Sequence, residues 1–173
     1  ELARGDADAA IIQNDGRAIL RSISPELASE LDSAGAVLTE EIVTICSRRN
    51  DHEDFGDVGQ TSGQLITVAG SEVSGTNVML NVIAGFDGGF TRPAYLYEES
   101  FYEAVDEVAG GDADCAVGVL SIDSPVMQRI NDDFGDEVRL VGSWDNNFRD
   151  LESRGEQVYG WRAISKDTPG LEK

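Results

Sequence analysis

The chain has 173 residues, of which 40% are hydrophobic and 7% aromatic, so it holds enough apolar material for a packed core and is not expected to be disordered. Its 33 acidic and 13 basic residues give a formal net charge of -20, and its longest basic run is Arg48-Arg49, which excludes nucleic acid as a partner. No stretch approaches the roughly 20 consecutive apolar residues of a membrane span, so direct membrane insertion is not expected.

Two ten-residue segments of the chain are alike. Residues 1–10 read ELARGDADAA and residues 107–116 read EVAGGDADCA, with seven identical positions. In each segment a helix is predicted to end at a glycine, Gly5 or Gly111, because the left-handed conformation costs glycine least. An Asp-Ala-Asp turn then leads into a continuous apolar run, which is typical of a parallel strand covered on both faces. The segments therefore predict two copies of a helix, a tight turn and a buried strand, unless a common turn recurs by chance.

The two copies differ in what precedes them. Residues 65–108 provide a strand and helices before the second copy, whereas nothing precedes the first. The chain also starts with Glu1 rather than Met, which indicates a processed protein or an excised fragment. If the copies are equivalent, the upstream part of one lobe is expected to lie outside these residues.

The segment between the first copy and residue 63 is expected to contain two helices and one strand. Pro25 follows Ser24 at a plausible first helical turn, and Gly35 is placed to end that helix. The expected elements are a loop at 13–16, the start of a short helix at 17–20, a helix at 26–33, a strand at 41–46, and a loop or short helix at 47–63.

A strand at 65–69 is predicted to run through a Gly/Ser/Thr turn into a helix that starts near Ser74. The first N–H groups of a helix have no partner within it, and the helix dipole adds partial positive charge there. A carboxylate or phosphonate-like group is therefore a candidate ligand, with close approach at Gly75 and hydroxyl donors at Ser74 and Thr76. The simpler interpretation is an ordinary N-cap.

The remainder of the chain continues the alternation of helices and strands. An apolar stripe at helical spacing marks a helix at about 98–108, and we interpret it as core rather than as a ligand cage. Its members are Tyr95, Tyr97, Phe101, Val105 and Val108. Further predicted elements are a helix from Ser124-Pro125, a strand at 138–141, a strand or crossing segment at 155–165, and a turn at 168–170.

The two cysteines, Cys46 and Cys115, lie in apolar strand-like runs at a spacing that fits no metal motif, so no metal is expected. Buried thiols are the simpler interpretation. A disulfide between neighbouring strands is the more specific interpretation, and it requires an oxidising compartment. A nucleophilic Cys46 near His52, the chain's single histidine, is a third hypothesis, but no positioned third group can be named.

At this point the residues resemble a known family. Residues 5–15, GDADAAIIQND, look like the segment of TRAP-associated extracytoplasmic immunogenic (TAXI) solute receptors in which a lobe-one strand ends in a Gln-Ser-Asp-like loop. Ser74-Gly75-Thr76 resembles that family's helix-opening turn, and residues 111–116 resemble its helix-to-strand step. The resemblance runs over nearly the whole chain. Two positions depart from the family's pattern: Asn14 occupies a position where the family usually has Ser, and Ser121-Ile122-Asp123 occupies one where it often has small apolar residues.

The resemblance implies an α/β fold of the type II periplasmic-binding-protein kind, with one complete lobe plus part of the other and helices on both faces of a mostly parallel sheet. Residues 1–40 would end lobe one, 41–145 form lobe two, and 146–173 return toward lobe one. Such a protein is periplasmic or extracytoplasmic, needs no cofactor, and delivers a small, carboxylate-bearing molecule to membrane transporter subunits. Ligand-facing candidates are Gln13, Asn14, Ser74, Gly75, Thr76, Asn77, Ser121 and Asp123, with Arg48 and Arg92 as donors to an anionic group.

Two other functions stay open. A sensory domain that reports ligand to a fused signalling module would carry the same lobes. An enzyme on the same architecture is the less favoured hypothesis, because only Cys46 and His52 offer a nucleophile and a base.

Overall fold

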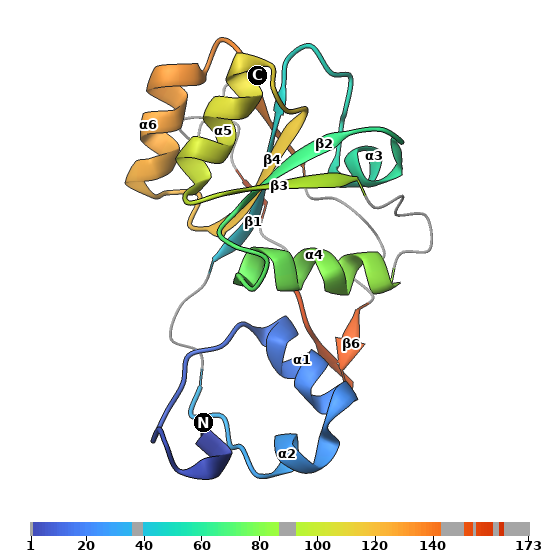
Figure 1. The fold of residues 1–173 in the computed structure, drawn as a ribbon, viewed down its shortest axis with the longest axis vertical. Coiled ribbons are helices and arrows are strands. Elements are labelled where there is room, and N and C mark those ends of the chain that lie inside the picture. The colour runs from blue at the N-terminus through green and yellow to red at the C-terminus, as the bar shows by residue number, and fades with distance from the viewer. Residues whose placement is uncertain are drawn as a thin grey trace.

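A single five-stranded sheet organises the protein (Figure 1). The computed structural model describes residues 2–35, 40–86, 93–142, 151–153, 155–160 and 163–164. The strand order is β3-β2-β4-β1-β5, in which β2 pairs in parallel with β3 and β4, and β1 pairs antiparallel with β4 and β5. Four strands therefore point the same way, as the mostly parallel sheet predicted. The strands are β1 (Glu41–Ser47), β2 (Leu65–Ala69), β3 (Ala94–Glu98), β4 (Cys115–Leu120) and β5 (Val138–Val141).

Helices cover both faces of this sheet, which confirms the predicted α/β class. On one face α3 (Phe55–Gln60) and α4 (Gly75–Phe86) pack apolar side chains against β2 and β4. On the other face α5 (Phe101–Gly110) and α6 (Pro125–Phe134) bury a second apolar cluster against β1 and β4. The predicted stripe residues Phe101, Val105 and Val108 are buried in this second cluster, as expected for core.

A disulfide between Cys46 and Cys115 cross-links β1 to the central strand β4. The two residues lie directly opposite each other in the antiparallel β1–β4 pair, and their Cα atoms are 4.0 Å apart. Both side chains are fully buried. The interpretation as buried thiols was wrong, because the register of β1 against β4 brings the sulfur atoms together, and register is a property of the folded sheet.

The second copy of the repeat folds as predicted. Helix α5 ends at Gly111, whose φ of 90° is left-handed, and residues 112–114 turn the chain into β4. Strand β4 lies between β2 and β1, and its residue Val117 is fully buried. The continuous apolar run of this copy thus belongs to a strand covered on both faces.

The first copy forms its turn but not its strand. The 3-10 helix η1 (Leu2–Arg4) ends at Gly5, whose φ of 76° is left-handed like that of Gly111. Residues 9–12 are not a strand, however, and the side chains of Ile11 and Ile12 are 77% and 56% exposed. The prediction of a buried strand was wrong here because a strand requires neighbours for its main-chain hydrogen bonds, and no described segment pairs with this one.

Three other elements differ from the sequence-based expectation. Residues 13–16, expected as a loop, contain the start of α1 (Asn14–Ile23), which packs Ala18 and Ile19 against Val82 of α4. The helix expected at 26–33 is the shorter α2 (Pro25–Ser29). Tyr95 and Tyr97, assigned to a helix, lie on strand β3, where their alternate spacing turns both rings toward the core cluster under α4.

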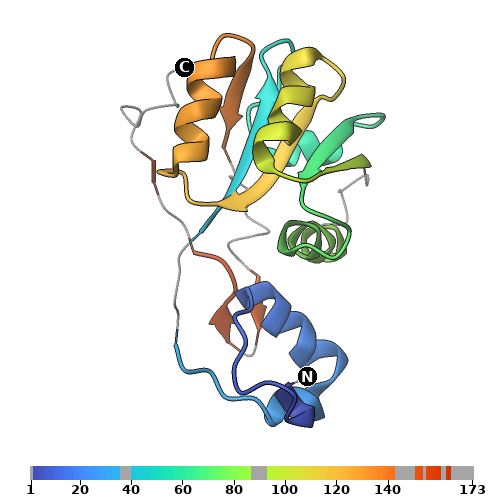
Figure 2. The ribbon, with the colours of Figure 1, turned by 60° about the vertical axis from the view of Figure 1, so that its left-hand side comes forward.

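The C-terminal part returns to the N-terminal segment. The two-residue strands β6 (Glu152–Ser153) and β7 (Glu156–Gln157) form a hairpin, and Leu151 and Val158 pack with α1 and α4. Figure 2 shows α1, α2 and this hairpin together below the five-stranded sheet. The turn expected at 168–170 lies outside the described residues. The segment expected at 155–165 is described except for residues 161, 162 and 165, and it contains strand β7. The expected division of the chain into lobes at residues 40 and 145 stays a prediction. All five strands of the large sheet lie between these two boundaries.

We expect removal of the disulfide to destabilise the protein strongly. The bond joins residues 69 positions apart. The chain-entropy relation for a loop of that size gives about 4 kcal/mol at 25 °C. A C46A/C115A double variant should therefore show a free energy of unfolding lowered by about that amount in a urea titration. Oxidised and variant proteins of equal stability would contradict the placement of this bond.

Candidate functional site

Three helices begin at one edge of the sheet. Strands β2, β3 and β4 are parallel neighbours, so their carboxyl ends share an edge, and each leads directly into a helix. The amino end of β1 lies at the same edge, because Glu41 pairs with Leu120 at the end of β4. Open α/β sheets present ligands at this edge, where side chains of several loops converge.

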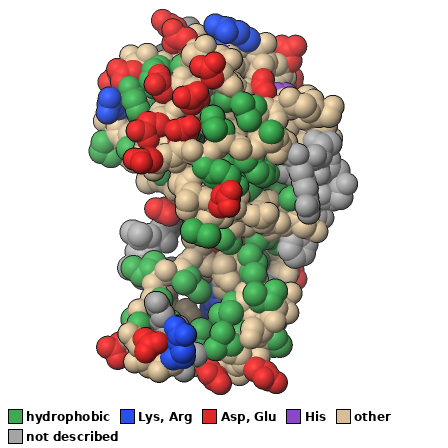
Figure 3. Space-filling model, viewed as in Figure 1, with side chains coloured by type: hydrophobic (Ala, Val, Ile, Leu, Met, Phe, Trp, Pro, Cys, Tyr) green, Lys and Arg blue, Asp and Glu red, His purple; other side chains and the backbone are tan. Residues whose placement is uncertain are grey.

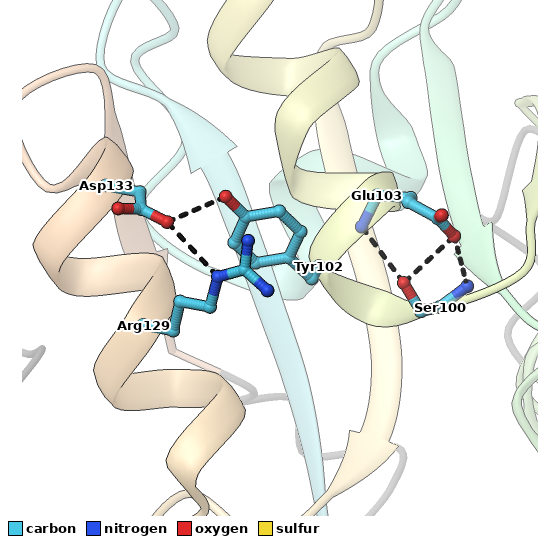
Figure 4. Close-up of polar contacts among 5 residues, drawn as sticks. All are labelled: Ser100, Tyr102, Glu103, Arg129 and Asp133. Carbon is cyan, nitrogen blue, oxygen red and sulfur yellow. Dashed lines mark hydrogen bonds and ion pairs between the residues drawn. The ribbon is translucent and has the colours of Figure 1, made fainter.

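The helices α5 and α6 use side chains of this chain to satisfy their first N–H groups. At α5, Ser100 and Glu103 form a reciprocal capping box, and the Glu103 carboxylate lies at the helix start (Figure 4). At α6, the Ser124 hydroxyl accepts from the Met127 N–H at 3.4 Å, and the Glu41 carboxylate accepts from the Ile122 N–H at 3.0 Å. The start of α5 therefore faces a carboxylate of the protein itself, whereas α6 has no acidic residue in its first turn and is capped by a hydroxyl.

The start of α4 is capped by a serine, as that of α6 is. The Ser74 hydroxyl accepts from the Asn77 N–H at 3.3 Å and lies 3.3 Å from the Ala69 carbonyl oxygen, to which it donates, so Ser74 serves as a cap. The first turn of α4 contains no acidic residue. Within the described ranges, the N–H groups of Gly75 and Thr76 and the Thr76 hydroxyl have no hydrogen-bond partner. This helix start therefore keeps uncompensated donors and partial positive charge.

Gln13 comes from the other end of the chain to this same point. It is the N-cap residue of α1, and its side chain lies against Gly75. A Cβ atom added at Gly75 would be 2.6 Å from Gln13 Cδ, so only glycine permits this approach. Two segments that are 62 positions apart, and that the sequence analysis placed in one site, are thus in contact. Asn14 follows as the exposed first residue of α1.

Asn77 is committed to the turn that opens α4. Its side-chain amide donates to the Glu72 carbonyl oxygen at 2.6 Å and accepts from the Tyr97 hydroxyl at 3.0 Å. Burial and the nearby Glu72 carboxylate raise the pKa of Tyr97, which keeps its hydroxyl protonated as a donor. Asn77 therefore shapes the turn, and its amide is not available in this arrangement.

Ser121 and Asp123 lie at the same edge, after β4. The Ser121 hydroxyl accepts from the Asp123 N–H at 3.4 Å, and its carbonyl oxygen accepts from the Ser124 N–H at 3.0 Å. Asp123 is exposed. The loop is held by its own backbone, and it places a hydroxyl and a carboxylate directly before the start of α6.

The two predicted arginines are not brought to this edge by the described structure. Arg48 follows β1, which runs opposite to its neighbours, so it lies at the far edge of the sheet. There its guanidinium donates to the Gly135 carbonyl oxygen from Nε at 3.2 Å and from Nη2 at 2.9 Å, closing the end of α6. Arg92 lies outside the described residues. We leave Arg48 out of the candidate site for this reason.

A buried pair of Asp15 and Tyr159 fixes α1, and sequence reasoning missed it. Asp15 is only 2% exposed; one carboxylate oxygen accepts from the Gly16 N–H at 2.7 Å and the other from the Tyr159 hydroxyl at 2.9 Å. The sequence pattern that could have revealed Asp15 is an acidic residue in the first turn of a helix. It was missed because residues 13–16 were assigned to a loop. Gln13 is two residues away, so this pair anchors the start of the helix whose N-cap residue is Gln13.

The nucleophile hypothesis does not agree with the structure. The Cys46 sulfur is bonded to Cys115 and is fully buried, so it is not available as a thiolate. His52 instead contacts the Gln64 side chain at the far edge of the sheet. No group of three or more potential metal ligands occurs among the residues described.

The Asp15–Tyr159 pair should make stability fall at alkaline pH. Burial, the Asp15 charge and the hydrogen bond to Asp15 raise the pKa of Tyr159 above its ordinary value near 10. Its contribution is therefore present below pH 10 and is lost as the pH rises. Above pH 10, wild type should lose up to about 1.4 kcal/mol of unfolding free energy per pH unit more than Y159F. Urea titrations from pH 8 to 11.5 would measure this, and parallel curves would refute it.

Comparison with known proteins gives similarities of fold over part of the chain. No protein-family model and no curated protein matches it. An ancestral arginine-binding protein bound to arginine is 18% identical, with a TM-score of 0.47 over 77% of this chain and 59% of that one. The periplasmic VFT2 domain of BvgS from Bordetella pertussis is 17% identical, with a TM-score of 0.46 over 62% and 40%.

The L-cystine solute receptor of Neisseria gonorrhoeae, in its unliganded open conformation, is 10% identical, with a TM-score of 0.44 over 61% of this chain and 38% of that one. The chain thus spans between 38% and 59% of the length of these three structures. No helix within the described ranges combines the length and apolar character of a membrane span.

Proposed function

We propose that the chain is a ligand-capturing part of an extracytoplasmic solute-binding protein, and that it binds the anionic group of a small molecule at the start of α4. The observation that carries this proposal is the set of donors at the start of α4 that have no partner among the described residues: the Gly75 and Thr76 N–H groups and the Thr76 hydroxyl. The neutral Gln13 side chain lies against Gly75 at this helix start, whereas the start of α5 faces the Glu103 carboxylate. Residues 1–40 and 146–173 would belong to one lobe and residues 41–145 to the other.

An anion at this position would be held by directed donors rather than by net charge. The protein carries a formal charge of -20, so its overall field repels anions. Free N–H groups at Gly75 and Thr76, together with the helix dipole, act at short range and oppose that field locally. The Thr76 hydroxyl adds a donor, and Thr76 is buried, with 6% of its surface exposed. A carboxylate fits this arrangement, and phosphonates share its chemistry.

The second end of the ligand would meet polar groups of both lobes. Gln13 and Asn14 approach from the α1 side, and Ser121 and Asp123 approach from the end of β4. Arg92 stays a candidate donor from outside the described residues.

The disulfide supports an extracytoplasmic location for this function. Structural disulfides form and persist in oxidising compartments and are rare in the cytosol. A periplasmic protein that hands its ligand to membrane transporter subunits is consistent with that location, and the resemblance to TAXI receptors favours a TRAP transporter as the partner. A ligand-sensing domain of a signalling protein is the alternative, because it would carry the same lobes.

Binding should depend on the Thr76 hydroxyl. Calorimetric titration of the 173-residue chain with glutamate, glutamine, arginine, cystine, succinate and phosphonoacetate would identify a ligand class. For whichever compound binds, T76V should weaken the affinity about tenfold, because one hydrogen bond to a charged group contributes about 1.5 kcal/mol.

The matched control is T61V, which makes the same chemical change at the end of α3, where the Thr61 hydroxyl bonds only within its own helix. Its affinity should equal that of wild type. An absence of heat with every compound would count against the proposal, and so would equal losses in T76V and T61V.

A further inference from the structure

The side chain of Gln13 lies over the start of α4. Its carboxamide surrounds the position that a Cβ atom at Gly75 would take: Oε1 is the nearest atom, followed by Cδ at 2.6 Å and Nε2 at 2.7 Å. The N–H groups of Gly75 and Thr76, which have no partner among the described residues, belong to this same first turn. A neutral group of the protein itself therefore covers the turn at which we propose anion binding.

The carboxamide of Gln13 is held there by packing alone. Gln13 is the N-cap residue of α1, but its side chain makes no capping hydrogen bond. Within the described ranges neither Oε1 nor Nε2 has any other hydrogen-bond partner. Moving the side chain away from Gly75 therefore breaks no hydrogen bond and loses only the van der Waals contact with a glycine, which is small.

The backbone that carries this side chain is fixed. The Gln13 carbonyl oxygen accepts from the Arg17 N–H at 3.2 Å, which closes the first turn of α1. Asp15, two residues further on, is buried and accepts from the Tyr159 hydroxyl at 2.9 Å. Figure 1 shows α1 directly below α4. The side chain can thus rotate about its single bonds while its attachment stays beside α4, which keeps the carboxamide at a high effective concentration there.

We propose that the Gln13 side chain is an autoinhibitory cover of the anion site, because its carboxamide competes with the anionic group of a ligand for the first turn of α4. This inference rests on the proposed function and adds a regulation of that same site. The apparent affinity is then the intrinsic affinity reduced by the fraction of time in which the turn is uncovered. A carboxylate displaces the carboxamide because its charge-assisted hydrogen bonds to N–H groups are roughly twice as strong as neutral ones.

A competitor and a ligand contact at Gln13 differ in the sign of their effects. Truncation of a side chain that holds the ligand weakens binding, whereas truncation of a side chain that competes with the ligand strengthens it. A carboxylate at the same position would be a stronger competitor, because it would bring a tethered anion to the unpartnered N–H groups. Two substitutions at one position therefore have opposite expected effects.

The test follows the amide signals of Gly75 and Thr76 by ¹H–¹⁵N NMR while sodium acetate is added to the 173-residue chain at constant ionic strength. Q13A should bind acetate at least threefold more tightly than wild type, which corresponds to a turn that is covered for about two thirds of the time. The matched control N14A truncates the exposed neighbouring side chain and should leave the Kd unchanged.

The opposite change uses Q13E with N14E as its control. Both variants add one negative charge, at adjacent positions, so they repel acetate equally at long range. Q13E should bind acetate at least tenfold more weakly than N14E. Without acetate, Q13E alone should already move the Gly75 and Thr76 signals, because its carboxylate would accept from these N–H groups. Circular dichroism would check that all four variants keep the fold.

Equal or weaker acetate binding by Q13A would overturn the cover, and so would equal losses in Q13E and N14E. In both cases a response of Gly75 and Thr76 to acetate in wild type would still support the proposed function. No response in wild type or Q13A, together with unmoved signals in Q13E, would overturn the cover and the anion site together. A response that appears only in Q13A would support the cover.

Discussion

The antiparallel pairing of β1 with β4, cross-linked by Cys46 and Cys115, is the constraint on which the rest of the arrangement depends. The disulfide joins β1 to the central strand β4, and both of its cysteines are fully buried. Because β1 alone runs against its neighbours, its amino end brings Glu41 to the edge where three helices begin, and its carboxyl end takes Arg48 to the opposite edge. The direction of one strand thus decides which charged side chains can reach the candidate site.

The distribution of acidic residues gives the candidate site its character. Acidic side chains gather over α5 and α6, as Figure 3 shows, where Asp133 is also bonded to Tyr102 and Arg129. Helix α4 starts with Gly75 and Thr76 and has no acidic residue in its first turn. The start of α4 keeps donors that have no partner among the described residues, and this coincides with the arrival of Gln13.

One local unit has two different outcomes in this molecule. The turn with a left-handed glycine and Asp-Ala-Asp forms in both copies, because it needs only short-range hydrogen bonds. The strand that should follow forms only where β2 and β1 flank it. Secondary structure in the second copy is therefore stabilised by neighbours far away in sequence, and the exposed isoleucines of the first copy mark the place where such neighbours are lacking among the described residues.

The sequence by itself determined the α/β class, strands β2, β4 and β5, the start of α4 at a Ser-Gly-Thr turn, and the αL glycines, because apolar periodicity and capping act over a few residues. Tertiary structure alone decided the direction of β1, the disulfide, the contact of Gln13 with Gly75 and the Asp15–Tyr159 pair. It also decided that Tyr95 and Tyr97 lie on a strand. These features depend on register and on contacts between distant segments, which no local pattern encodes.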